Sequence, residues 1–145
     1  MNTSYNFIHT LEWTLSTKEQ PQESTDATVP GACQLDWAAY RKLPSYSYGT
    51  GFLEYEFMED LDFVYKSVFD NPCPEGDKSV WFVAKGIDYK CSIFLNNKLI
   101  ARNEGSQTPV EVQLGKLLDR DNILEIEIDR VPLKEGAPKG REQAA

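Results

Sequence analysis

The sequence predicts an all-β protein, an antiparallel β-sandwich with one short helix. Apolar and acidic residues alternate strictly over 124–129, and apolar and polar residues alternate again over 110–114. A period of two is typical of strands that bury one face. Short candidate strands separated by proline, glycine and asparagine turns favour a sandwich over other fold classes.

The apolar content supports one compact domain and excludes several classes of partner. The chain has 145 residues, of which 41% are hydrophobic, and its net charge is −8. That charge repels phosphate backbones, so we expect no nucleic-acid partner. No apolar stretch approaches the ~18 residues that a membrane-spanning helix needs, so we expect no membrane span.

The other elements follow from the same periodicity and from turn signals. A helix is predicted over 34–43, where apolar residues fall at helical spacing before Pro44. The dipeptide Asn96-Asn97 predicts a two-residue hairpin, since asparagine tolerates positive φ. The run 80–84 is apolar throughout and predicts a central strand covered on both faces. Further strands are expected at 11–15, 64–69, 91–95 and 98–101.

Two polar segments are predicted to lie outside the strands. Residues 16–28 are expected to form a surface loop, and the proline-rich segment 71–77 a second one. We assign 1–131 to the sandwich, which is either complete or lacks its last strands, and 132–145 to a linker or tail toward absent downstream domains.

The chain offers few residues for cofactor, metal or disulfide chemistry. Its cysteines are Cys33, Cys73 and Cys91, without a CxxC pair, so we expect free thiols and leave open one bridge, Cys73–Cys91. Acidic and amide side chains at 119, 121 and 122 lack the spacing of a calcium loop. No phosphate-binding glycine motif occurs either. We therefore expect no metal and no cofactor.

The order of short motifs resembles the N-terminal sugar-binding domain of glycoside hydrolase family 2, which includes β-galactosidases, β-mannosidases and β-glucuronidases. The resemblance covers roughly Trp13 to Ile128 and implies a jelly-roll, galactose-binding-domain-like sandwich. The motifs that carry it are, in order, Trp13, Val29-Pro30-Gly31, Tyr48-Gly49-Thr50, Asp60-Leu61-Asp62-Phe63-Val64-Tyr65, Gly86-Ile87-Asp88-Tyr89, Leu95-Asn96-Asn97-Lys98, Asn103-Glu104-Gly105, Pro109-Val110-Glu111-Val112 and Asp121-Asn122-Ile123-Leu124-Glu125-Ile126.

Several positions depart from the family pattern. The family usually has Asn-Gly where this chain has Asn96-Asn97, glycine where it has Asp121, and often tryptophan where it has Phe63. In the Val29-Pro30-Gly31 turn, we expect proline to fix φ and glycine to supply unusual dihedral angles. The long segment 46–62 is more similar to the β-mannosidase branch than to the β-galactosidase branch.

The resemblance implies a non-catalytic domain of a larger enzyme that hydrolyses terminal β-linked sugars. In that family the catalytic pair lies in a separate (β/α)₈ barrel, and a barrel of about 250 residues does not fit here. We therefore expect the chain alone to be inactive, with the barrel and, through the parent enzyme, carbohydrate as its partners. The alternatives are a free-standing carbohydrate-binding module and a purely structural domain. The compartment stays open, with a periplasmic or secreted mature form slightly preferred to a cytoplasmic one.

Candidate sugar contacts gather before the predicted strand 64–69. Acidic residues there are interleaved with aromatic rings, a mixture that suits carbohydrate; the alternative is an acidic loop with its rings in the core. The resemblance implies Asp60 and Glu59 as the nearest contacts, with Tyr48 and Arg102 as weaker candidates. No catalytic residue is expected. The acidic residues are Glu54, Glu56, Glu59, Asp60 and Asp62, and the aromatic ones are Phe52, Tyr55, Phe57 and Phe63.

Three further expectations concern the outward acidic residues, the single histidine and assembly. The acids Glu125, Glu127 and Asp129 are expected to be solvated positions on the outward face of a strand. The single histidine, His9, has no Ser or Cys motif beside it, so no catalytic triad is expected. If closing strands lie beyond Ala145, an unpaired strand edge would favour a homodimer.

Overall fold

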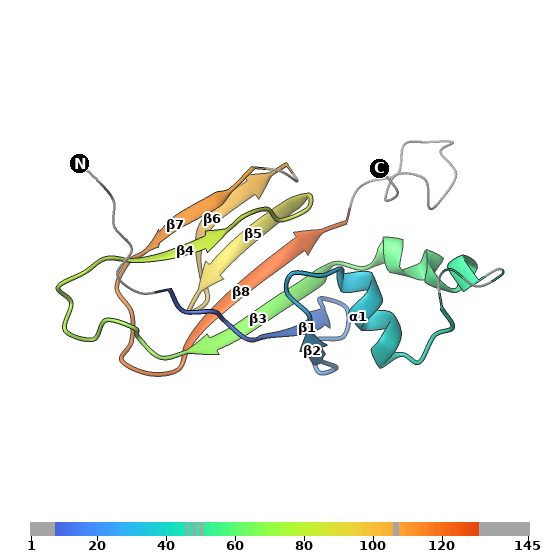
Figure 1. The fold of residues 1–145 in the computed structure, drawn as a ribbon, viewed down its shortest axis with the longest axis horizontal. Coiled ribbons are helices and arrows are strands. Elements are labelled where there is room, and N and C mark those ends of the chain that lie inside the picture. The colour runs from blue at the N-terminus through green and yellow to red at the C-terminus, as the bar shows by residue number, and fades with distance from the viewer. Residues whose placement is uncertain (1–7, 46, 48, 50, 106–107, 131–145) are drawn as a thin grey trace.

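The computed structural model describes residues 8–45, 47, 49, 51–105 and 108–130. In this part of the chain, antiparallel strands form one six-stranded and one two-stranded sheet (Figure 1). The predicted antiparallel β-fold is therefore confirmed. Its elements are β1 (Trp13–Thr17), β2 (Thr25–Ala27), α1 (Cys33–Tyr40), the 3₁₀ helix η1 (Gly51–Asp60), β3 (Phe63–Phe69), β4 (Val80–Ala84), β5 (Lys90–Leu95), β6 (Lys98–Glu104), β7 (Val110–Leu114) and β8 (Asn122–Asp129).

Strands far apart in the sequence are neighbours in the larger sheet, whose order is β2-β1-β3-β8-β5-β6. β8 pairs with β3, where Ile128 lies opposite Phe63, and with β5, where Asp129 lies opposite Lys90. The smaller sheet pairs β4 with β7. The last described strand thus lies inside the sheet, between strands that precede it in the sequence.

The main core lies between the two sheets. Trp13 connects them, with its ring edge-on to Tyr65 of the larger sheet at 6.4 Å and to Phe82 of the smaller sheet at 6.2 Å, measured between ring centroids. Edge-to-face rings are a favourable arrangement for aromatic pairs. The buried members of this core are Phe82, Cys91, Ile93, Leu95, Val110, Leu114, Leu124 and Ile126.

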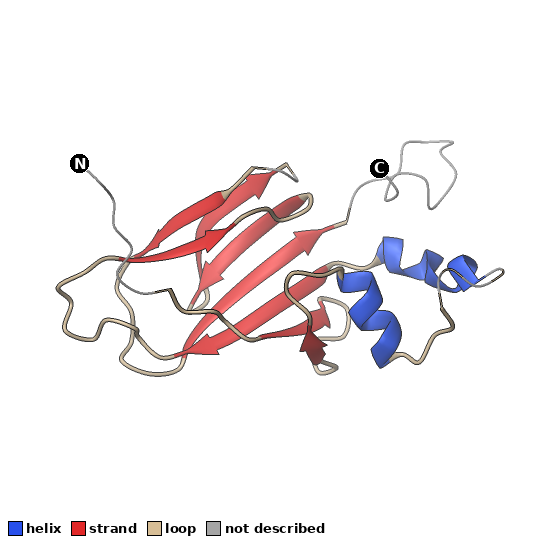
Figure 2. Cartoon of the chain, in the orientation of Figure 1, coloured by secondary structure: helices blue, strands red, loops and turns tan. Residues whose placement is uncertain are grey.

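A second buried cluster joins the helices to the larger sheet. Figure 2 shows both helices, in blue, at one end of the strands. Trp37 of α1 is fully buried, with its ring edge-on to Phe63 of β3 at 6.2 Å. Met58 of η1 and Leu15 of β1 complete the contact. This cluster fixes where η1 ends relative to β3.

The structure corrects the prediction of a single helix. The helix expected over 34–43 is α1, which begins at Cys33 and ends at Tyr40. One short helix was expected, but the described residues contain two, because η1 was not predicted. Acidic and aromatic residues alternate in η1 without a 3.6-residue period, so periodicity gave no helical signal. Within the described part of the chain, no helix combines the length and apolarity needed to cross a bilayer.

Two strand predictions were wrong. The run 80–84 was expected to be covered on both faces, but Trp81 is 46% and Val83 48% exposed. An apolar run does not show whether a second layer covers it, and β4 faces the core only through alternate residues such as Phe82. The polar segment 16–28 also contains a strand, β2, whose three residues form the edge of the larger sheet.

The predicted hairpin is confirmed, and an amide pair supports it. Asn96 and Asn97 have φ values of 48° and 68°, so both occupy the left-handed region that the turn requires. Asn96 Oδ1 accepts the N–H of Ile123 at 2.8 Å, and Asn96 Nδ2 donates to Asn122 Oδ1 at 3.1 Å. Asp121, where the family usually has glycine, also has a positive φ of 56°. These departures are tolerated because short polar side chains reach the left-handed region.

Gly31 is required for a different reason from the one expected. Its φ lies outside the left-handed region, so the turn does not use a dihedral angle reserved for glycine. Instead, a Cβ at this position would lie 2.4 Å from the carbonyl oxygen of Thr28. The close approach of the two backbone segments excludes any side chain there.

All three cysteines are free. Cys91 is buried in the main core, whereas Cys33 and Cys73 are half-buried. The Cys73–Cys91 bridge that the sequence left open is therefore not formed. Burial raises the pKa of the Cys33 thiol to about 11 and also raises the pKa of the Cys91 thiol. These thiols behave as small apolar residues of the interior.

The two asparagines of the hairpin are expected to contribute differently to the free energy of unfolding. Asn97→Gly should raise the free energy of unfolding by roughly 0.5 kcal/mol, because glycine adopts positive φ without steric cost. Asn96→Gly should lower it by about 1–2 kcal/mol, because two side-chain hydrogen bonds are lost. Urea denaturation of both variants checks this; equal effects of the two substitutions would contradict it.

Alkaline pH should weaken the fold. Burial raises the pKa of Cys33 from 9.0 to about 11, and it also raises the pKa of Tyr65 above its usual 10.0. The unfolded chain ionises both groups at a lower pH than the folded chain does. Their contribution to stability is complete below about pH 9 and decreases as pH rises toward 11, by up to about 2 kcal/mol.

Urea midpoints measured between pH 8 and pH 11 test this dependence. Cys33→Ala should flatten it, because only the contribution of Tyr65 then remains. A midpoint that stays constant up to pH 11 in the unmodified chain would contradict the argument.

Candidate functional site

Two of the predicted sugar contacts lie where η1 ends. Glu59 is buried, with 8% of its surface exposed, whereas Asp60 is exposed. Glu59 Oε2 is buried and has no hydrogen-bond partner among the described residues. A buried polar atom without a partner is costly, so this oxygen favours a donor from a ligand or from another part of the protein.

The loop that follows η1 is held to the end of β8. Arg130 Nη1 donates to the carbonyl oxygen of Asp60 at 2.8 Å, and the Arg130 N–H donates to Asp62 Oδ1 at 2.9 Å. Arg130 Nε also lies 3.7 Å from Asp62 Oδ1. The backbone at Asp60 is therefore held by the charged side chain of the residue that follows β8.

The acidic and aromatic residues of this segment separate into two groups. Phe63 is buried in the second cluster, and Tyr55 donates its hydroxyl to the carbonyl oxygen of Pro44 at 3.0 Å. Phe57 is 42% exposed, and Glu54 is exposed as well. Part of the set is thus structural, as the alternative interpretation expected, and part remains at the surface.

Arg102 lies in a different place, in a groove of about 640 Å³ that we call the sheet groove. Arg102 on β6 pairs with Ser92 on β5, which pairs in turn with Glu127 on β8. The groove lies on the face of the larger sheet that points away from the main core. Its lining residues are Lys18, Lys90, Cys91, Ser92, Phe94, Arg102, Asn103, Glu104, Glu127 and Asp129.

Ion pairs organise one side of the sheet groove. Lys18 Nζ lies 3.0 Å from Glu127 Oε2 and 3.8 Å from Asp129 Oδ1. The hydrogen bond to Glu127 raises the pKa of Lys18, so this amine stays charged at neutral pH. Glu127 and Asp129 point outward as predicted, but they are only partly exposed because Lys18 covers them.

The sheet groove and the end of η1 are adjacent through a chain of contacts. The Lys18 N–H donates to the carbonyl oxygen of Asp62 at 2.9 Å, and Asp62 binds Arg130, which holds Asp60. The structure therefore brings Glu59, Asp60 and Arg102 to the same end of the larger sheet. Tyr48, the fourth candidate, lies outside the described residues, as does the predicted linker 132–145.

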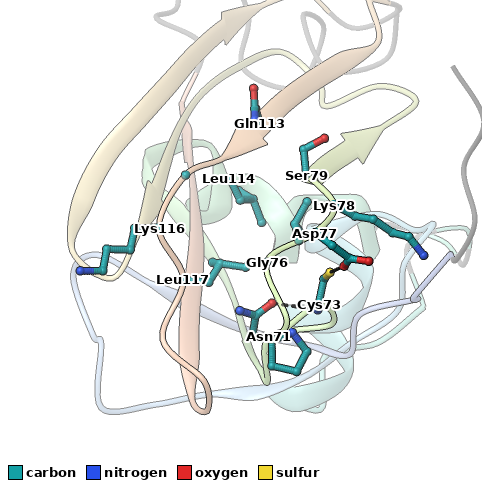
Figure 3. A pocket seen from close by; sticks show the side chains of 13 residues that line it. Asn71, Cys73, Gly76, Asp77, Lys78, Ser79, Gln113, Leu114, Lys116 and Leu117 are labelled. Carbon is teal, nitrogen blue, oxygen red and sulfur yellow. Dashed lines mark hydrogen bonds between the residues drawn. The ribbon is translucent and has the colours of Figure 1, made fainter.

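A second groove, the loop groove, lies between the loop that precedes β4 and the end of β7 (Figure 3). Cys73 Sγ donates to Asp77 Oδ1 at 3.1 Å, which lowers the pKa of that carboxyl. With Glu75, these side chains bring ligand atoms within 4.8 Å of one another. Glu75 and Asp77 are exposed, and exposed groups of this kind commonly gather without an ion, so they do not define a metal centre.

The remaining residues considered for chemistry do not form a site. His9 is exposed. Asn122 does not serve as a calcium ligand in this arrangement, because its side chain is bound to Leu118, Phe69 and Asn96. The important residues that sequence reasoning missed are Lys18 and Arg130. Each contacts a partner more than 60 residues away, so no local pattern reveals it.

Comparisons with known proteins agree with this fold. A sequence profile described as "Glycosyl hydrolase 2 galactose-binding domain-like" matches residues 13–144. The chain is similar to a protein named β-mannosidase B from Emericella nidulans, with 26% identity over 126 residues. That match covers 83% of this chain but 15% of the relative.

Solved structures of related enzymes share the fold of this chain. The β-D-mannosidase of Dictyoglomus thermophilum matches with a TM-score of 0.73 and 25% identity over 81% of this chain and 14% of that protein. A β-glucuronidase of Ruminococcus gnavus shares the fold, with a TM-score of 0.56 and 17% identity over 82% of this chain and 20% of that protein. The chain thus spans about 15% of the length of the curated relative it matches. Because the profile covers most of its length, the chain belongs to the glycosyl hydrolase 2 galactose-binding domain-like family.

Proposed function

We propose that the chain is the non-catalytic N-terminal domain of a β-glycosidase, of the β-mannosidase branch in preference to the β-galactosidase branch. The observation that carries this proposal is the size of the relatives: β-mannosidases match across four-fifths of this chain, which corresponds to one-seventh of their own length. In the proposed parent, a downstream (β/α)₈ barrel breaks the terminal β-linked sugar bond, and this domain supports the barrel.

In this proposal the end of η1 contributes to the wall of the substrate pocket. The unpartnered Glu59 Oε2 would accept a hydrogen bond from a sugar hydroxyl, and the exposed Asp60 would offer a second acceptor. Arg130 holds the Asp60 backbone, which favours a fixed contact over a mobile one. A purely structural domain, the alternative, would leave both carboxylates without influence on the reaction.

The gene downstream of the chain and the kinetics of its product test the proposal. The full-length product should hydrolyse p-nitrophenyl β-D-mannopyranoside, and the 145-residue chain alone should release no nitrophenol. In the full-length enzyme, Glu59→Gln and Asp60→Ala should each lower kcat/KM by roughly tenfold or more, because a contact to the sugar is lost or weakened.

Glu54→Gln is the matched control, since Glu54 lies on the same helix and is exposed. It should leave kcat/KM unchanged. If Glu59→Gln and Asp60→Ala also leave it unchanged while the melting temperature is preserved, the domain is structural. Hydrolysis by the isolated chain would overturn the proposal altogether.

We further propose that the isolated chain forms a homodimer through the edge of β4. Among the described residues β4 pairs only with β7, and Trp81 and Val83 are half exposed on its outer face. The unpaired backbone edge of β4 favours pairing with a strand of another chain, and the exposed apolar side chains on its outer face would be covered by that contact. Light scattering should give a dimer mass at high concentration and a monomer mass for Val83→Lys; a monomer for the unmodified chain would contradict this.

A further inference from the structure

We propose that the sheet groove is a second carbohydrate site, one that binds a neutral oligosaccharide on the outer face of the larger sheet. This site is separate from the Glu59–Asp60 contact and does not depend on it. Three features support such a site: the order of side chains across β5, β6 and β8, their charge balance, and the rigidity of the strands that carry them.

Two cross-strand rows line the groove. In one row Lys90 lies between Glu104 and Asp129. In the neighbouring row Ser92 lies between Arg102 and Glu127. Donors and acceptors therefore alternate across the first row and along β6, whereas β8 presents two carboxylates and Ser92 can both donate and accept. A sugar hydroxyl both donates and accepts, so a polyhydroxylated ligand can satisfy such a mixed surface where a purely anionic or cationic ligand cannot.

Phe94 supplies the apolar part of the groove. It lies on the same face of β5 as Lys90 and Ser92, because successive residues of a strand alternate between faces. It is half-buried, so part of its surface remains available. An aromatic side chain beside alternating polar groups matches a pyranose, which has an apolar C–H face and a polar rim.

The charge of the groove selects a neutral ligand. Its three cationic side chains, on Lys18, Lys90 and Arg102, are balanced by the three carboxylates of Glu104, Glu127 and Asp129. The whole chain carries a net charge of −8, which repels acidic polysaccharides. The volume of about 640 Å³ lies in the range of small-molecule sites, roughly 300–1,000 Å³.

The groove is also preorganised. Lys18 is already held by Glu127 at 3.0 Å, and each lining residue except Lys18 belongs to a paired strand of the larger sheet. Side chains on paired strands lose less freedom on binding than side chains on loops, which lowers the entropic cost of recognition.

Titration of the ¹⁵N-labelled 145-residue chain with β-1,4-mannohexaose, followed by amide chemical shifts, tests the site. We expect saturable shifts confined to residues 90–94, 102–104 and 127–129, with Kd near or below about 1 mM. Hexagalacturonate should bind at least tenfold more weakly. No saturation by mannohexaose, tighter binding of hexagalacturonate, or shifts confined to residues 55–62 would each overturn the proposal.

Variants separate this site from its surroundings. Arg102→Ala and Phe94→Leu should each weaken binding about tenfold, since the first removes a donor and the second removes the ring but keeps apolar volume. Lys98→Ala removes an exposed cation of β6 outside the groove and should leave Kd unchanged. Glu54→Gln removes an exposed carboxylate of η1 outside the groove and should also leave Kd unchanged. The location of the amide shifts distinguishes failure of this site from failure of the η1 contact. Equal effects of Arg102→Ala and Lys98→Ala would overturn the assignment.

Discussion

The fold depends on one buried amide, that of Asn122 at the start of β8. The residue is completely buried, and its side chain makes hydrogen bonds to three separate segments. Asn122 Oδ1 accepts the N–H of Leu118 at 2.8 Å, and Nδ2 donates to the carbonyl oxygens of Leu118 and Phe69 at 2.8 and 3.3 Å. Asn96 Nδ2 is a further donor to Oδ1. The end of β3, the β5–β6 hairpin and the loop before β8 therefore meet at a single side chain.

This constraint determines how the larger sheet is assembled. β8 lies between β3 and β5, and its first residue is bound both to Phe69 at the end of β3 and to Asn96, which follows β5. An apolar residue of similar size at 122 would remove the hydrogen-bond partner of backbone groups of Leu118 and Phe69. A satisfied polar network of this kind specifies one register, because a shift by one residue would break every hydrogen bond at once.

The sequence alone predicted the strands with a period of two and the turns between them. β7 coincides with the predicted strand 110–114, because alternation reports directly which face is buried. The η1 helix was not predicted, because its residues show no 3.6-residue period. The two-sided burial assigned to β4 was wrong, because a local apolar run does not show which layer covers the segment. Trp81 is apolar yet half exposed because no described element packs over it.

The candidate site was predictable only in part. Glu59 and Asp60 were identified from the family resemblance and from their place before a strand, and the structure adds that one is buried and the other exposed. Arg102 was a weak candidate, whose neighbours became apparent only from strand register. Lys18 and Arg130 were not identified, since their partners Glu127 and Asp62 are distant in sequence.

The Arg130 contact has a mechanical consequence. Arg130 is the last described residue after β8, and its guanidinium holds the backbone of Asp60. Tension or rotation at Arg130 would therefore act on the end of η1 through the arginine side chain as well as on β8, to which Arg130 is covalently joined. The position of the Glu59–Asp60 end of η1 is in this way mechanically coupled to the end of β8.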